Sequence, residues 1–384
     1  MARLKGKVSR PQIQNSNSID VIPRVNASTT DLIGIVEQTV ESCCAVYEFK
    51  GISEQIDMGA ILGETDPEFS KDRFQRRRSG RAQGPLSALT VIIDVAYHQE
   101  GWLYMLQSGA IQRILKNIIG NALKYTSAGW VRIQVSAKKV KGEIILQFIV
   151  SDSGKGISAT FQQSRLFNPF AQEDILQSGT GLGMSIVKQI VQHLGGEIKV
   201  SSQVGVGTRV QITLPGEPEL SADSDDSCSR VRSRTTGKTV YLAGFERTVP
   251  ASRLLYESIA NYVTSWYQME IVGDVSFADL IISNECPELL KHFRRTSSPD
   301  SQAFNLFSTE KSPTNNVYHA KRPLIVLCSN ASHEFFGFQP EPGKVIDFSS
   351  KPCGPYKLAR SILFCLESQE TVDGAYGGAD RVQA

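Results

Sequence analysis

The sequence predicts an α/β protein with two domains: a two-layer α/β sandwich, followed by a doubly wound sheet of parallel strands. Three observations lead to this fold class. The chain has 384 residues, and one domain usually takes roughly 100–200 residues. In the first half, amphipathic helices alternate with strands joined as hairpins. In the second half, single apolar strands alternate with helices, which is the pattern of a parallel sheet.

The expected domain boundaries follow changes in composition. A charged stretch at residues 63–87 contains Gly and Pro and predicts a mobile basic loop inside the first domain. Between the domains, Pro, Gly, Ser and acidic residues leave almost nothing to bury. The expected divisions are a disordered or truncated segment (1–28), the first domain (29–215), an acidic Ser-rich linker (216–237), the second domain (238–367) and a flexible tail (368–384).

The elements of the first domain follow from periodicity and from helix-start and helix-stop signals. From Thr29 to about Phe49 apolar residues recur on one helical face, and Thr30 or Asp31 is placed to cap this helix. The expected order is helix 29–49, buried strand 89–96, helix 108–126, hairpin strands 130–138 and 143–152, helix 183–194, and hairpin strands 196–203 and 208–215. Helices over a mixed, mainly antiparallel sheet make a two-layer sandwich.

In the second domain the pattern changes to strand, helix, strand. The expected order is strand 238–245, helix 252–266, strand 278–284, helix 286–295, strand 322–330, strand 344–350 and helix 354–367.

The overall composition points to a soluble cytoplasmic protein. The net charge of +2 gives no field that would attract nucleic acid or a membrane surface. The longest apolar runs are strand-sized and fall short of the roughly 20 residues of a membrane helix. Seven cysteines without C-x-x-C spacing suit a reducing compartment.

Two glycine-rich segments carry the first chemical signal. DSGKGI (152–157) follows a predicted strand, and GTGLGMS (179–185) precedes a predicted helix. Glycines let backbone N–H groups approach phosphate oxygens, and a helix N-terminus adds partial positive charge. No Gly-Lys-Ser/Thr follows, so the second segment is not a Walker loop, and no short strand precedes it as in a dinucleotide fingerprint.

A polar stripe on the helix upstream is the discriminating feature. Asn117 and Asn121 are four residues apart and therefore share one helical face, with Lys124 about one turn further on. Burying these groups on an otherwise apolar helix is costly unless they meet a partner. Amide and phosphate oxygens together suit an octahedral Mg²⁺ that keeps several waters. Asp152, at the end of a strand, is placed to accept a hydrogen bond from the amine of a base.

These segments, taken in order, resemble the sequence boxes of sensor histidine kinases. The matching segments are the N box (111–126), the G1 box (152–157), the F box (166–172), the G2 box (179–196) and the closing strand (204–215). The resemblance implies the Bergerat ATP-binding fold shared with gyrase, Hsp90 and MutL-type ATPases. The residue sequences NALKYT (121–126) and PFAQED (169–174) favour histidine kinases over those relatives.

The resemblance implies ATP and Mg²⁺ as cofactors and assigns roles by position. Asn121 would be the Mg²⁺ ligand, Asn117 would face the phosphates and the metal, and Lys124 would contact phosphate. Tyr125 would lie along the nucleotide, and Asp152 would bind the adenine amine. Gly156 would aid Asp152, Phe167 and Phe170 would anchor the ATP lid, Gly179, Gly181 and Gly183 would shape that lid, and Thr208 would lie beside the adenine. The remaining nucleotide-binding positions are Gly154, Ile157, Thr180 and Leu182. Phe167 and Phe170 fit a core position equally well.

A histidine kinase also needs a dimerisation hairpin that carries the acceptor histidine. Only about 28 irregular residues precede the first predicted helix, and they contain no histidine. The hairpin is therefore expected in trans or in missing sequence, and a response-regulator receiver is the further expected partner. His333, in ASHEFFGF, resembles the start of an acceptor site but follows the boxes instead of preceding them, so it is not expected to accept phosphate.

The second domain resembles the receiver-like segment of fungal-type hybrid histidine kinases. Asn284 stands where a receiver has its phosphorylatable Asp, and Cys328 replaces a Thr or Ser with Ser329 beside it. Lys351-Pro352 keeps the Lys-Pro signature. Because an amide cannot attack a phosphoryl donor, we expect a docking or spacing module. Two functions remain open: a histidine protein kinase that is incomplete as given, or a nucleotide-responsive interaction module without catalysis.

Overall fold

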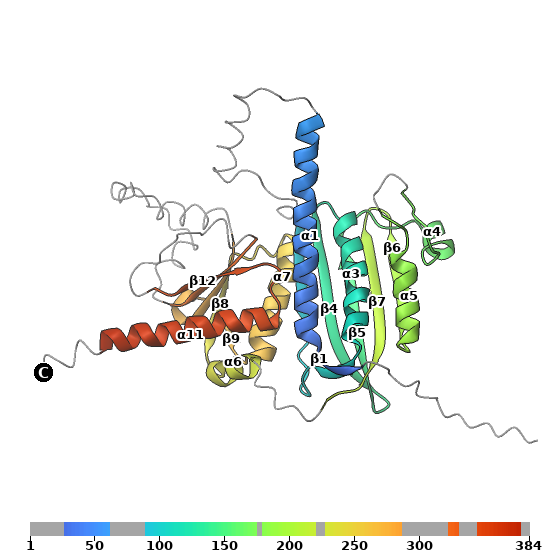
Figure 1. Ribbon diagram of the computed structural model, residues 1–384. Helices are drawn as coiled ribbons and strands as arrows, with labels where there is room; N and C mark the ends of the chain where they lie inside the picture. Colours follow the sequence, from blue (N-terminus) through green and yellow to red (C-terminus); the bar gives the residue numbers. More distant parts are fainter. Residues whose placement is uncertain are drawn as a thin grey trace, which may run out of the picture.

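The computed structural model describes residues 27–61, 89–174, 179–219, 227–285, 322–329 and 344–377 (Figure 1). The predicted basic loop at 63–87, the predicted helix at 286–295 and His333 lie outside the described residues. Within the described part, no helix is both long and apolar enough to cross a membrane.

The first domain is a two-layer α/β sandwich, as predicted. Its sheet has the order β2-β4-β5-β7-β6, with β2 and β4 parallel and the other neighbours antiparallel. The strands are β2 (Leu89–Val95), β4 (Gly129–Val140), β5 (Glu143–Asp152), β6 (Glu197–Gln203) and β7 (Gly207–Gly216). One face is covered by α1 (Leu32–Ile61), α3 (Ser108–Tyr125) and α5 (Gly183–His193), lying side by side (Figure 1). Buried aliphatic side chains of both layers form the core.

The first helix begins later and ends later than the sequence predicts. Residues Ser28–Asp31 form strand β1, which pairs antiparallel with β3 (Leu103–Leu106). Helix α1 then starts at Leu32, where Asp31 Oδ1 accepts a hydrogen bond from the N–H of Gly34 at 3.1 Å. Of the two predicted caps, Asp31 therefore has this role. The Ser-Thr-Thr run is better suited to an extended strand because β-branched side chains favour that conformation.

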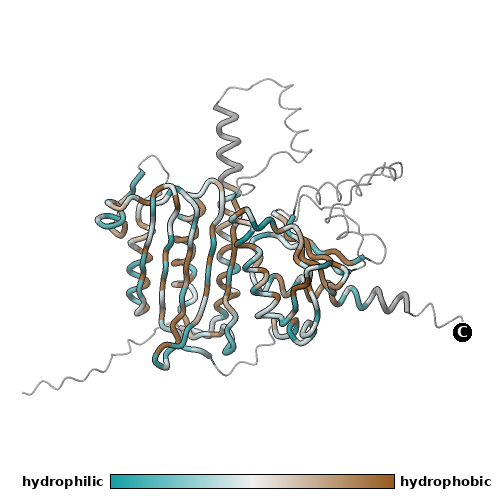
Figure 2. Tube along the Cα trace, turned by 180° about the vertical axis from the view of Figure 1, so that it is seen from behind, coloured by the Kyte–Doolittle hydropathy of each residue, from teal (hydrophilic) through white to brown (hydrophobic). Residues whose placement is uncertain are grey.

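The second sheet is fully parallel and has the order β12-β11-β10-β8-β9. Its strands are β8 (Thr239–Ala243), β9 (Glu270–Ile271), β10 (Leu280–Asn284), β11 (Leu324–Cys328) and β12 (Ile346–Ser350). This is the order of flavodoxin-like doubly wound folds. Helices α7 (Pro250–Asn261) and α11 (Pro355–Gly377) pack on one face. Every residue of β11 is buried, and the neighbouring strand β10 is also mainly apolar. Figure 2 shows hydrophobic segments in this domain.

Three local assignments need correction in this second half. The interval expected to be a linker contains helix α6 (Ser227–Thr235), which buries Cys228 and Val231 and packs on α11. Helix α11 continues to Gly377, so the expected flexible tail from residue 368 is partly helical. Arg234 of α6 lies 2.6 Å from Glu370 of α11, which places that part of the helix beside α6. The predicted helix 252–266 is α7 followed by a π-helical turn, η2 (Tyr262–Trp266).

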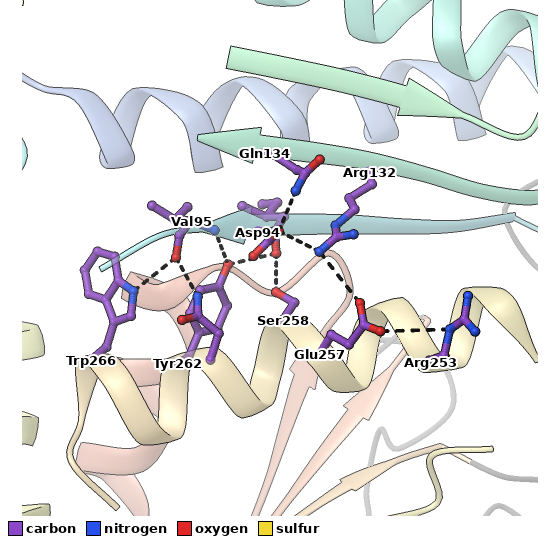
Figure 3. A network of polar contacts seen from close by, with 11 residues as sticks. Asp94, Val95, Arg132, Gln134, Arg253, Glu257, Ser258, Tyr262 and Trp266 are labelled. Carbon is purple, nitrogen blue, oxygen red and sulfur yellow. Dashed lines mark hydrogen bonds and ion pairs between the residues drawn. The ribbon is translucent and has the colours of Figure 1, made fainter. Parts of the chain in front are cut away.

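The two domains meet where side chains of α7 and η2 cover the edge strand β2 (Figure 3). The carbonyl of Ile93 accepts hydrogen bonds from Ser258 Oγ at 2.6 Å and Tyr262 Oη at 2.8 Å. Tyr262 Oη also accepts from Val95 N–H at 3.2 Å. The carbonyl of Val95 accepts from Asn261 Nδ2 at 2.9 Å and from Trp266 Nε1 at 3.1 Å. Side chains thus satisfy backbone groups that would otherwise need another strand.

Ion pairs between charged side chains of the two domains lie beside this contact (Figure 3). Arg132 of β4 lies 2.8 Å from Asp94 of β2, and 3.9 Å from Glu257 of α7. Gln134 also donates to Asp94, at 3.0 Å. Arg132 therefore contacts one carboxylate from each domain.

A second contact joins α1 to the start of α11 through the buried carboxyl of Glu37. This side chain is 6% exposed, and its Oε1 accepts a hydrogen bond from the N–H of Tyr356 at 2.8 Å. Gly354 permits the approach, because a Cβ there would lie 2.4 Å from Glu37 Oε1. Burial raises the pKa of Glu37 to about 7, against smaller opposing effects of the hydrogen bond from Tyr356 and the charge of Arg360.

This raised pKa predicts that the folded protein is more stable at mildly acidic pH. Glu37 holds its proton more tightly when folded, so its contribution is present below the unfolded pKa of 4.5 and is lost as pH rises through about 7. The difference is on the order of 3 kcal/mol. In urea unfolding at pH 5 and pH 8, Glu37→Gln should remove this part of the pH dependence. Glu143→Gln, at an exposed position of β5, should retain it; equal profiles for Glu37→Gln and wild type would contradict the assignment.

Candidate functional site

A cavity of about 320 Å³ lies between α3, the ends of β5 and β7, and the segment that precedes α5. It brings together most of the side chains that the sequence singled out, although they are spread over nearly a hundred positions. The predicted residues that line it are Asn117, Asn121, Lys124, Tyr125, Asp152, Gly156, Ile157, Gly179, Thr180, Gly181, Gly183 and Thr208. The predicted boxes therefore converge on one site.

Asp152 ends β5 and presents its carboxylate inside this cavity. Its Oδ1 accepts hydrogen bonds from the N–H of Gly154 at 2.9 Å and of Thr208 at 3.2 Å. Oδ2 is the oxygen left for a ligand. Burial raises the pKa of Asp152, and the two backbone hydrogen bonds counteract part of that rise. A fixed, partly desolvated acceptor is suited to an amine of a bound base.

The loop after Asp152 is held against β6 and β7. Gly156 has φ +73°, and a Cβ there would lie 2.1 Å from the carbonyl oxygen of Gln203, so only glycine fits. The N–H of Ile157 donates to Ser202 Oγ at 2.8 Å, and Ser202 Oγ lies 2.9 Å from Thr208 Oγ1. Ser202 was not predicted as a site residue, yet it fixes two predicted ones.

The polar stripe of α3 faces the other end of the cavity. Asn117 Nδ2 donates to the carbonyl of Arg113 at 2.7 Å, which leaves Oδ1 directed at Gly183. A Cβ on Gly183 would lie 3.0 Å from that oxygen, and 3.9 Å from Asn121 Nδ2. The two amides and the start of α5 therefore approach one another. The helix N-terminus adds the partial positive charge that favours phosphate.

Two lysines flank Tyr125 at the mouth of the cavity. Lys124 Nζ lies 3.0 Å from Tyr125 Oη, and Lys155 Nζ lies 4.8 Å from the centre of its ring. Lys155 also forms an ion pair with Asp174 at 3.3 Å. Lys155 belongs to the segment DSGKGI but was not predicted as a site residue, because no spacing rule connects its charge to a ligand site.

Four predicted residues do not line the cavity: Gly154, Phe167, Phe170 and Leu182. For Phe170 the alternative of a core position is wrong, because its side chain is 75% exposed and its φ is +63°. Phe167 is half-buried, and its ring centre lies 5.0 Å from Lys188 Nζ. The buried residue of the F box is Leu166, 8% exposed, which lines the cavity together with Gln172.

The domain around this cavity matches a known family. Residues 107–218 match the family described as histidine kinase-, DNA gyrase B-, and HSP90-like ATPase. The virulence sensor protein BvgS of Bordetella bronchiseptica is 40% identical over 109 residues, which cover 27% of this chain and 9% of BvgS. The sensor protein EvgS of Escherichia coli K12 is 33% identical over 121 residues, covering 31% of this chain and 10% of EvgS. The chain thus corresponds to a small part of these relatives.

A solved structure extends the fold comparison beyond this domain. ShkA, described as full-length and in complex with AMPPNP, has a TM-score of 0.51 at 18% identity. The match covers 89% of this chain and 58% of ShkA, so it supports the fold of both domains. Residues 107–218 are therefore an ATPase domain of the histidine kinase-, DNA gyrase B- and HSP90-like family, homologous to that of sensor histidine kinases.

Proposed function

We propose that this chain is the ATP-binding catalytic portion of a hybrid histidine protein kinase, which positions ATP with Mg²⁺ for phosphoryl transfer to a histidine in a two-component phosphorelay. The observation that carries the proposal is the single cavity that unites the amide stripe of α3, the carboxylate of Asp152 and the glycines before α5. The homology to sensor kinases supports the same reaction class.

In this proposal the adenine lies at the Asp152 end of the cavity. Asp152 Oδ2 accepts a hydrogen bond from the exocyclic amine, while Oδ1 stays engaged with the backbone. Tyr125 lies along the nucleotide, and its ring is flanked by Lys124 and Lys155. The triphosphate extends toward Gly181 and Gly183, where it meets backbone N–H groups and the start of α5.

Asn117 and Asn121 are suited to hold Mg²⁺ together with the phosphates. Asn117 directs an amide oxygen toward the start of α5, and both side chains line the cavity. Two neutral oxygen ligands suit a cation that takes its other ligands from phosphate and water. When bound, Mg²⁺ neutralises charge on the transferring phosphoryl group.

The phosphoryl acceptor is proposed to come from a dimerisation hairpin, in trans or in further sequence of the same protein. Of the described histidines, His98 and His193, neither lines the cavity. Catalysis by this domain is therefore positioning and electrostatic, without a covalent intermediate on its own side chains. A response-regulator receiver is the proposed later acceptor. The proposed setting is the cytoplasm, and the cysteine spacing, with no C-x-x-C pair, supports it.

The first test is the affinity for Mg·ATP measured by titration calorimetry. Asn121→Ala removes a proposed metal ligand and is expected to lower the affinity at least about tenfold. Lys116→Ala is the matched control, because Lys116 is exposed on the same helix and does not line the cavity. An unchanged affinity in Asn121→Ala would refute the metal assignment.

A second measurement separates a kinase from a non-catalytic nucleotide-responsive module. Wild-type chain, labelled ATP and a purified acceptor hairpin from a related sensor kinase are mixed, and phosphohistidine is measured as alkali-stable label. Transfer supports the kinase. ATP binding without transfer to several such hairpins supports the interaction module instead, for which lid closure would alter a partner surface.

A further inference from the structure

The carboxylate of Glu285 lies among polar groups at the carboxyl ends of strands β10, β11 and β12. Glu285 follows β10, Ser329 follows β11 and Lys351 follows β12. Lys351 Nζ lies 2.9 Å from Glu285 Oε1 and 3.2 Å from Asn284 Oδ1. The N–H of Ser329 donates to Glu285 Oε2 at 2.8 Å, and its hydroxyl donates to Oε1. Three donors from two neighbouring strands thus converge on one carboxylate.

The ion pair between Lys351 and Glu285 is largely buried, and the carboxyl of Glu285 is ionised. The side chains of Lys351 and Glu285 are 14% and 17% exposed. Burial alone would raise the pKa of Glu285, but the charge of Lys351 and the hydrogen bonds from Ser329 hold it below its ordinary value. Such a pair needs well-placed donors to offset the cost of desolvation, and these polar groups supply them.

Donors that converge on an oxyanion at the carboxyl edge of a parallel sheet form an anion-binding site. We propose that the structure contains such a site, formed by Lys351 and Ser329, and that Glu285 of the same chain is its permanent occupant. With this carboxylate in place, the receiver-like domain keeps one conformation without any phosphoryl group. The inference concerns the second domain and does not depend on the proposed ATP site.

The occupied site is connected to the first domain through a short segment. Lys351 lies five positions before Tyr356, whose N–H donates to Glu37 of α1 at 2.8 Å. Between them, Gly354 touches the Glu37 side chain closely enough that a Cβ would lie 2.4 Å from it. Lys357, one position later, lies 2.8 Å from Glu41 of α1. By holding Lys351, Glu285 fixes the segment that presents the start of α11 to the ATPase domain.

Emptying the site with Glu285→Ala in the full chain tests the proposal. The variant is expected to unfold at a temperature lower by about 5 °C. Sodium acetate should raise that temperature saturably, relative to sodium chloride at equal ionic strength, because acetate replaces the missing carboxylate. Wild type should not respond, and Glu285→Ala/Lys351→Met should lose the response. Amide exchange of Tyr356 should be faster in Glu285→Ala and slowed again by acetate.

A folded Glu285→Ala that responds to acetate no more than the double variant would overturn the proposal. Should Glu285→Ala not fold, Glu285→Gln keeps the shape and removes the charge. In wild type the Lys351 amine is held 2.9 Å from the Glu285 carboxylate, so loss of this ion pair should make acylation of that amine by acetic anhydride faster than in wild type. Labelling of Lys351 at the wild-type rate in Glu285→Gln would refute the role of the carboxylate.

Discussion

Replacing Asp152 with asparagine is expected to lower ATP affinity by at least about 100-fold. The site would then present an NH2 donor to the adenine amine in place of a carboxylate acceptor. The Asn carbonyl oxygen can still accept from the backbone N–H groups of Gly154 and Thr208, which now bond to Oδ1. The loop should therefore keep its shape. The Nδ2 group would face the exocyclic amine of adenine, and two donors cannot pair.

A change of nucleotide preference makes this prediction specific. Inosine triphosphate carries a carbonyl oxygen where ATP carries the amine, so Asp152→Asn should bind it more tightly than ATP, and wild type should show the opposite order. Calorimetry with both nucleotides measures the two affinities. Asp174→Asn is the control: Asp174 also lines the cavity but pairs with Lys155, so this variant should keep the wild-type preference for ATP. Parallel losses for ATP and inosine triphosphate in Asp152→Asn would count against adenine recognition by this carboxylate.

Truncating Tyr262 to alanine is expected to destabilise the folded chain by about 3–5 kcal/mol, which is the usual cost of removing a large buried aromatic side chain. Tyr262 is fully buried, and its ring contacts Trp266 edge-on with centres 6.3 Å apart. Its hydroxyl joins the carbonyl of Ile93 to the N–H of Val95. The loss therefore combines packing with backbone hydrogen bonds.

Tyr262→Phe separates these two contributions. The ring stays, the carbonyl of Ile93 keeps its bond from Ser258, and the N–H of Val95 loses its partner. An unsatisfied buried N–H costs about 1–3 kcal/mol. Urea unfolding measures the stability, and amide exchange at Val95 reports the local bond. Tyr256→Phe on the same helix should change neither, since it has no hydrogen bond to β2; equal effects at positions 256 and 262 would contradict the interface role.

The sequence could name most of the residues that line the cavity, because they belong to local patterns. Asn117 and Asn121 lie one helical turn apart and Asp152 ends an apolar strand, so pattern predicts each of these positions. The resemblance to histidine kinases then implied that they share one site, and all three line the cavity. Phe170 was different. Its neighbours gave no period, and its exposed position depends on a backbone with φ +63° that no short motif specifies for phenylalanine.

The contact between the domains could not be predicted because it depends on groups that look ordinary in sequence. In the sequence, Tyr262 is one of several aromatic residues in a predicted helix. Its hydroxyl can donate to the carbonyl of Ile93 only when β2 packs beside that helix. Glu37 reads as a solvated charge on α1, although Tyr356 and Gly354, more than three hundred positions away, enclose it. Helix α6 could not be predicted for the same reason, since its few apolar residues are buried by parts of the chain distant in sequence, among them α11.

The covered edge of β2 has a consequence for how the protein behaves in a crowded solution. An edge strand with open N–H and C=O groups is a template to which a strand of another molecule can add, and this is a common start of aggregation. Here, the groups of Ile93 and Val95 are already bonded to a helix of the same chain. The second domain thus blocks the addition of another strand at the β2 edge of this sheet.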